Sequence, residues 1–229
     1  MKNKRIFAVI AIALGLVVLL FLAARDYTGS NYYGKFRQAR ERAKSVQSEF
    51  DRLEIYLNKA VRFAPRKAYF EAKGSLYLDM ALSENQFGSE EKRDEFLDKA
   101  KEVFERQILM YPASAFAYYS LGRTYMLYNF PLLTYAAKGR AYFRKALFLQ
   151  PSDEFLNVNI LTVILSQWDL LTTEEKDDLH NRLESVLSGN EAFLNKINNL
   201  WKKDYGSLDR IKEILSRYPD LWDRIQKLF

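Results

Sequence analysis

An uninterrupted run of apolar residues lies near the start of the chain, from Ile6 to Ala24. As a helix these 19 residues extend roughly 28 Å, close to the bilayer core of about 30 Å. A cleaved signal peptide has a shorter apolar region of about 7–15 residues that ends in small residues, and Leu22-Ala23-Ala24 matches such a site poorly. The pattern therefore predicts an uncleaved transmembrane helix over residues 6–24, behind a basic flank of residues 1–5.

Basic residues stand on both sides of this run, so charge alone leaves the orientation nearly balanced. The short N-terminal flank carries Lys2, Lys4 and Arg5 without an acidic residue. The other flank begins with Arg25 and continues with several basic residues from Lys35 onward. Because long domains translocate largely regardless of their own charge, we predict a cytoplasmic N-terminus. In a bacterium this means a single span in the inner membrane with the following domain in the periplasm.

After the span, Gly, Pro and Ser divide a strongly helical sequence into segments. Residues 25–34 include Gly29 and Gly34 and predict a short linker. Ser83 to Ser89 predicts an irregular polar insert, and Thr172 with Glu175 predicts a capping box. The expected helices cover 35–64 (as one helix or two), 68–82, 90–110, 115–128, 136–149, 153–168, 172–187, 191–203, 208–217 and 219–228.

Two successive helix pairs share a set of spaced anchor residues. Each pair has a small residue with aromatic neighbours on its first helix, and a Phe eight residues before a closing Pro. Leu57 stands equally far before Pro65, which indicates an incomplete earlier pair. The anchors are Phe70, Gly74, Tyr77, Ala100, Phe104 and Pro112 in one pair, and Tyr118, Leu121, Gly122, Tyr125, Phe143, Ala146 and Pro151 in the next.

From Leu53 to Pro151, and more weakly to Leu187, these anchors resemble the tetratricopeptide repeat (TPR). The resemblance implies an all-α protein in which residues 35–187 form TPR-like helical hairpins stacked as an α-solenoid, because such a pair cannot bury its apolar face alone. The short helices of residues 188–229 would cap the stack. Lys73 stands where the family prefers Leu, Gly139 where it prefers Ala, and both intervals between closing prolines exceed the family length of about 34 residues.

The resemblance also implies a binding surface, since in this family the first helix of each pair lines a concave groove that holds peptides or partner segments. An Arg in such a groove pairs with a partner carboxylate. The same register continues with the apolar residues Leu156, Ile160 and Val163, which need to be covered by another segment. The groove is therefore either open to a partner or filled by the C-terminal helices. In register, the groove residues are Glu71, Ser75, Asp79, Phe116, Tyr119, Arg123 and Met126.

The composition is that of a helical globular domain, and it excludes several classes of function. The chain is 48% hydrophobic and 28% charged, with only 9 Gly and 5 Pro, too few for the many turns of an all-β fold. Its net charge of +6 is modest and spread along the chain, so we predict no nucleic-acid partner. The absence of Cys removes disulfides, thiol catalysis and thiolate metal sites.

Catalytic and cofactor motifs are missing from the sequence. The single histidine, His180, cannot form a His-based metal cluster, and neither a G-x-G-x-x-G nor a P-loop pattern occurs. We therefore predict no catalytic residue, metal, cofactor or small-molecule substrate. The resulting hypothesis is a non-enzymatic, membrane-anchored adaptor or scaffold for protein partners in secretion, pilus or surface-polysaccharide assembly. The alternative is a permanent structural subunit of a larger membrane complex, its groove filled by the chain itself.

The orientation is testable with a reporter fused after Phe229. Alkaline phosphatase is active only where its disulfides form, so the fusion should be active in the periplasm of a bacterial host. A cytoplasmic reporter at the same position is the control and should be inactive. The reverse pattern of activities would overturn the predicted orientation.

Overall fold

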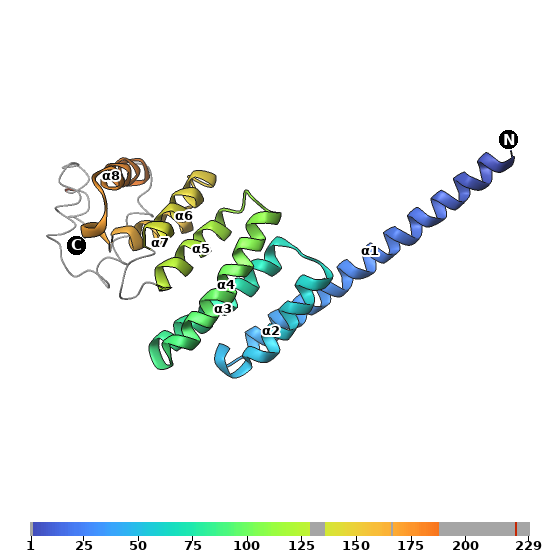
Figure 1. Cartoon of the computed structure of the whole chain (residues 1–229), viewed down its shortest axis with the longest axis horizontal. Helices are drawn as coiled ribbons and strands as arrows, with labels where there is room; N and C mark the ends of the chain where they lie inside the picture. Colours follow the sequence, from blue (N-terminus) through green and yellow to red (C-terminus); the bar gives the residue numbers. More distant parts are fainter. Residues whose placement is uncertain (1, 129–135, 166, 188–222, 224–229) are drawn as a thin grey trace. The chain divides into compact units, whose positions relative to one another are not determined.

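The computed structural model describes residues 2–128, 136–165, 167–187 and 223 of the chain. Within these residues the protein is all-helical, without a strand, as the sequence predicted (Figure 1). The connection 129–135 and the three short helices predicted within 188–229 lie outside the described residues. The elements are α1 Lys2–Arg42, α2 Val46–Phe63, α3 Lys67–Phe87, α4 Glu90–Met110, α5 Ala115–Tyr128, α6 Ala136–Leu149, α7 Glu154–Leu165, the short 3-10 helix η1 Trp168–Leu170 and α8 Thr173–Leu187.

The chain divides into two compact units, Met1–Gly139 and Arg140–Phe229. This division falls within α6. Unit 1 contains α1 to α5 and the first turn of α6. Unit 2 contains the rest of α6, α7, η1 and α8.

α1 continues from the apolar run into unit 1 without a break (Figure 1), so the prediction of a linker over residues 25–34 is wrong. Gly29 serves close packing instead of flexibility: a Cβ at this position would lie 2.6 Å from the Cβ of Ala64, which follows α2. Thr28 Oγ1 donates to the carbonyl of Ala24 at 2.7 Å, within the same helix. Gly29 is compatible with a helix here because its missing side chain lets α1 approach the end of α2.

In unit 1 each helix packs on the next along the chain, from α1 to α5. Ser45 and Ser89 cap α2 and α4, and each accepts a bond from the backbone N–H three residues on, as preferred N-cap residues do. Phe36 of α1, Leu53 and Leu57 of α2 and Leu76 of α3 form a buried cluster. The C-terminal part of α1 is therefore a full member of the fold.

α3 is longer than predicted, since it continues to Phe87 through the segment expected to be an irregular insert. Its polar last turns are supported from α4: Arg93 Nη1 donates to Asn85 Oδ1 at 3.4 Å, and Ser89 N donates to Glu84 Oε2 at 3.3 Å. α4, α5 and α6 have the predicted bounds. The connection between α3 and α4 is only Gly88 and Ser89.

Glycines lie at two close approaches between helices. A Cβ on Gly74 of α3 would lie 2.3 Å from Cζ of Phe104 on α4. A Cβ on Gly139, where the repeat family prefers Ala, would lie 3.0 Å from the carbonyl oxygen of Gly122 on α5. Most of the other anchors are inside the fold: Phe70, Tyr77, Ala100, Leu121, Tyr125, Phe143 and Ala146 are buried, Tyr118 is half-buried, and Pro112 and Pro151 are exposed.

In unit 2, apolar residues of α6, α7 and α8 are buried, among them Leu147, Ile160 and Leu179. The predicted capping box is confirmed, because Thr172 N donates to Glu175 Oε2 at 3.1 Å and Glu175 N donates to Thr172 Oγ1 at 3.2 Å. These reciprocal bonds begin α8.

Replacing Gly74 by Ala should destabilise the fold, because the added methyl group meets the fully buried ring of Phe104. Overpacking of this kind costs about 1–3 kcal/mol. The measurement is chemical unfolding of the full chain in mild detergent, followed by circular dichroism. Gly34→Ala on α1 is the matched control: its Cβ has no atom within 4 Å, so it should be neutral or stabilise by up to about 1 kcal/mol. Equal effects of the two substitutions would contradict this account of Gly74.

Candidate functional site

Charged side chains from three helices come together in unit 1. Arg40 Nη2 of α1 donates to Asp79 Oδ2 of α3 at 2.9 Å. Arg123 of α5 is close enough for its positive charge to act on the same carboxyl. The side chains of Arg40 and Asp79 are 40% and 42% exposed, so solvent and a partner can reach them. The structure thus brings the predicted residues Asp79 and Arg123 into one site and adds Arg40.

The electrostatics of this site favour an incoming anion. Burial raises the pKa of Asp79, and the nearby Arg40 and Arg123 offset this only in part. Two positive charges therefore act on one carboxylate whose charged form is itself disfavoured by burial. An acidic group of a partner could form charge-assisted hydrogen bonds with the guanidinium groups.

Aromatic side chains of α5 hold Arg123 in place. Arg123 Cζ lies 5.8 Å from the ring centroid of Tyr119, a distance at which a cation and a ring attract. The Tyr119 ring in turn lies 6.1 Å from that of Phe116. Tyr119 is only 4% exposed, and burial raises its pKa. Tyr119 therefore positions Arg123, while the half-buried Phe116 supplies an accessible aromatic surface.

Glu71, also predicted for the groove, belongs to an internal network. Its carboxylate accepts from Gln107 Nε2 at 3.3 Å and lies 3.6 Å from Lys67 Nζ. Gln107 is fully buried and donates from the same amide nitrogen to Ser114 Oγ at 3.0 Å. Glu71 thus connects α3 to the end of α4, and its role here is structural.

Met126 and Ser75 complete the predicted set. Met126 is half-buried and borders the close approach of α5 and α6, with its Cε 3.0 Å from the position of a Cβ on Gly139. Ser75 is half-buried on α3. The charged cluster therefore contains only part of the predicted groove.

Arg40 was missing from the predicted site because residues 25–34 were expected to form a linker, followed by one helix or two over residues 35–64. A signal was present: Ser30, Tyr33 and Phe36 repeat at three-residue spacing through this segment, as on one face of a helix. Tyr33 stacks on Tyr69 of α3 with ring centroids 4.5 Å apart, and a hydrogen bond of 3.1 Å joins Ser30 Oγ and Tyr69 Oη. This face aligns α1 with α3 and brings Arg40 to Asp79.

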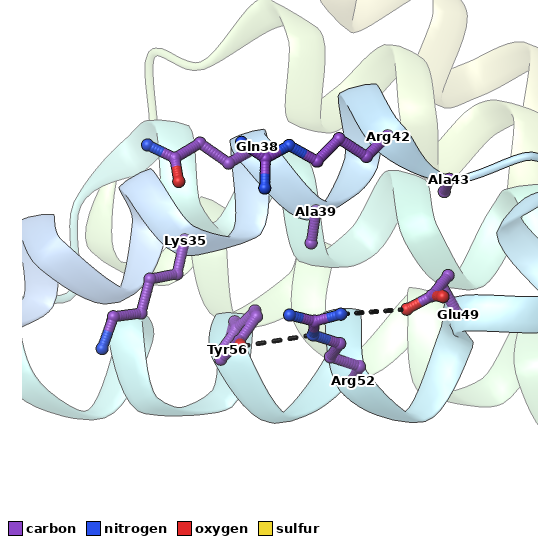
Figure 2. Close-up of a pocket in the computed structure, with 8 residues that line it drawn as sticks. All are labelled: Lys35, Gln38, Ala39, Arg42, Ala43, Glu49, Arg52 and Tyr56. Atoms are coloured by element: carbon purple, nitrogen blue, oxygen red, sulfur yellow. Dashed lines mark hydrogen bonds and ion pairs between the residues drawn. The ribbon is translucent and has the colours of Figure 1, made fainter.

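A cavity of about 130 Å³ lies between α1 and α2 (Figure 2). Figure 2 shows Arg52 between Glu49 and Tyr56, with Lys35, Gln38 and Arg42 along α1. Arg52 Nε donates to Tyr56 Oη at 3.3 Å, a bond that lowers the pKa of Tyr56. Arg52 Nη1 lies 3.6 Å from Glu49 Oε2. The cavity is a small, cationic and solvent-exposed hollow.

Unit 2 contains a smaller cavity of about 60 Å³ with an apolar floor that includes Leu161 and Leu171, and arginines around it. Arg140 Nε donates to Glu175 Oε1 at 2.8 Å, and the two side chains are only 9% and 13% exposed. Arg182 donates to Asn157 Oδ1 and to the carbonyl of Pro151. These arginines are engaged within unit 2.

Metal-binding clusters of three or more His, Cys, Asp or Glu side chains do not occur among the described residues. His180 belongs to α8. The Asp79 cluster consists of one carboxylate with the guanidinium groups of Arg40 and Arg123 near it.

No protein-family model and no curated protein matches the chain.

Replacing Asp79 by Asn should change stability in a pH-dependent way. The folded-state pKa of Asp79 is raised, so its charged form opposes folding at neutral pH and this cost disappears as the pH falls through that pKa. At neutral pH the variant should be as stable as the wild type or slightly more stable. The difference should be less than about 1 kcal/mol because the exposed side chain is screened by solvent, and it should shrink in acid.

The measurement is thermal unfolding of both proteins in detergent across the acidic to neutral range. Asp51→Asn, at an exposed position of α2, is the control. If Asp79→Asn is clearly less stable at neutral pH, the ion pair with Arg40 outweighs burial and the assigned direction is wrong.

Proposed function

We propose that the chain is a non-enzymatic, membrane-anchored adaptor whose TPR-like helix pairs stack as an α-solenoid with a C-terminal cap. Its partners are proteins that present an acidic segment to Arg40 and Arg123. The partner complex is one of cell-envelope assembly: secretion, pilus or surface-polysaccharide machinery.

The packing of unit 1 supports the repeat part of this proposal. α1 packs on α2 and α3 on α4, and small residues stand at the close approaches of α3 with α4 and α5 with α6. Close stacking of helix pairs needs such small residues. In this arrangement the C-terminal part of α1 pairs with α2, and this pair precedes the pair of α3 and α4.

The observation that carries the binding function is the meeting of Arg40, Asp79 and Arg123. These residues come from α1, α3 and α5, the first helices of three successive pairs in the proposed stack. One surface thus receives charged groups from every pair in unit 1. A partner segment lying across it would contact all three helices, which is how groove-binding segments gain affinity.

The membrane anchor rests on α1. It is the one helix in the described part of the chain that is long and apolar enough to cross a membrane, and the apolar window is fully exposed. Such exposure suits a helix whose solvent is lipid. We assign it to the bacterial inner membrane, with the helical domain in the periplasm.

A second candidate is a permanent subunit whose groove is filled by its own chain. The observation in its favour is the burial of Tyr119, which is 4% exposed, since a fully open groove would leave such an aromatic residue accessible. Stoichiometric co-purification with one partner complex after mild extraction would support it. Varied, substoichiometric partners would support the adaptor.

Site-specific photocrosslinking in the native membrane tests the adaptor. A photoreactive phenylalanine at position 116 should give discrete adducts with another protein, because Phe116 is the accessible aromatic of the site. Adding Arg123→Glu should weaken those adducts severalfold, since charge reversal repels an acidic segment.

Two controls separate binding from misfolding. The photoreactive residue in place of Ile55, 50% exposed on α2, should give no such adduct. Arg37→Glu, at a side chain 66% exposed on α1, should leave the adducts of position 116 unchanged. Adducts that persist undiminished with Arg123→Glu would remove the charged cluster from the binding function.

A further inference from the structure

The end of unit 1 beside the membrane anchor is close enough to the span to lie among lipid headgroups. Ala24 ends the apolar run, and Gly29 follows it by five residues, about 8 Å along a continuous helix. The headgroup layer extends roughly 5–8 Å beyond the hydrocarbon core on each side. Any group that contacts Arg25 to Gly29 therefore lies at headgroup depth.

The turn between α2 and α3 makes these contacts. Arg25 Nη2 donates to the carbonyl of Arg62 at 3.5 Å, and Arg66 Nε donates to Asp26 Oδ1 at 3.0 Å. Ala64 packs against Gly29. Figure 1 shows this turn beside α1. The exposed side chains of Arg62 and Arg66 are thus carried to the depth of lipid phosphates.

The last turn of α4 lies next to the same end. Tyr111, which follows α4, donates from Oη to the carbonyl of Pro65 at 2.7 Å. Just before it, Leu109 is 84% exposed and Met110 is 43% exposed. In the described part of unit 1, the other large apolar side chains exposed outside the span are Tyr27 and Ile55. Tyr27, Leu109 and Met110 are therefore at the end beside the span, and only Ile55 lies elsewhere in the described part of unit 1.

Charge at this end is mostly positive and solvent-accessible. Lys59, Arg62 and Lys67 are exposed. Asp26 is paired with Arg66, and Glu71 with Lys67; the exposed Glu102, Glu105 and Arg106 stand further back on α4. Exposed apolar side chains combined with basic residues are typical of surfaces that bind anionic lipid interfaces.

We propose that this end, defined by Arg62, Arg66, Leu109 and Met110 and called here the membrane-facing end, rests on an anionic lipid surface. Leu109 and Met110 enter the interface, and the arginines contact lipid phosphates. The proposal rests on the membrane span of the proposed function, which holds the surface beside the bilayer. Lipid is the occupant because the chain's own span brings it there, and the positive charge complements anionic headgroups.

The absence of Cys permits a direct test with single cysteines in the full chain. Leu109→Cys carries an environment-sensitive fluorophore, in vesicles of phosphatidylcholine with or without phosphatidylglycerol. The matched control is Gln86→Cys, exposed at the far end of α3, about 28 Å from Lys67 along the helix. Lipids with a quenching group on their acyl chains report contact.

A blue-shifted emission and quenching at position 109, and neither at position 86, is the expected result. Both effects should increase with phosphatidylglycerol and decrease in high salt or with Arg62→Glu. A solvent-like signal at position 109 overturns the proposal, and so does a blue shift without lipid quenching, which would indicate a protein cover.

Alkaline carbonate extraction of the same vesicles separates this outcome from failure of the span. Protein that stays in the membrane while position 109 reports solvent refutes only the lipid contact. Release of the protein would refute the span, and the lipid contact with it.

Discussion

The close approach of α1 to the end of α2 at Gly29 is the constraint on which unit 1 depends. Nothing larger than hydrogen fits there without displacing Ala64. The contact makes the C-terminal part of α1 a packed helix, which buries Phe36 against α2 and α3 and carries Arg40 to Asp79. A side chain at position 29 would separate α1 from the domain, and both the core and the charged cluster would lose a component.

On α5 the same few turns serve the core and the surface. Leu121 and Tyr125 are buried, while Phe116 and Arg123 stay partly accessible. Tyr119 belongs to both groups, since it is buried and yet orients the guanidinium of Arg123. If this face binds a partner as proposed, recognition depends on how rigidly the core holds Tyr119, and a substitution there would alter both stability and binding.

Helices bounded by strong capping or helix-breaking residues were predicted well from the sequence. The predictions failed where the role of a residue depends on a distant neighbour. Ser89 and Pro112 mark ends that local chemistry decides, and α4 has the predicted bounds. A glycine at position 29 is equally compatible with a flexible linker and with a close contact between helices. Only the packing of Ala64 against it shows which of the two occurs. For the same reason, the resemblance to the repeat family implied one surface for Asp79 and Arg123 but could not supply Arg40, whose position depends on how α1 packs.

α1 runs from the apolar run into unit 1 as one continuous helix. Arg40 follows Ala24 by 16 residues, so a straight α1 holds the charged cluster about 24 Å above the hydrocarbon core. With the span in the bilayer as proposed, that height is set by helix geometry and changes only as the helix tilts. In the proposed adaptor, a partner would have to present its acidic segment at about that distance from the membrane.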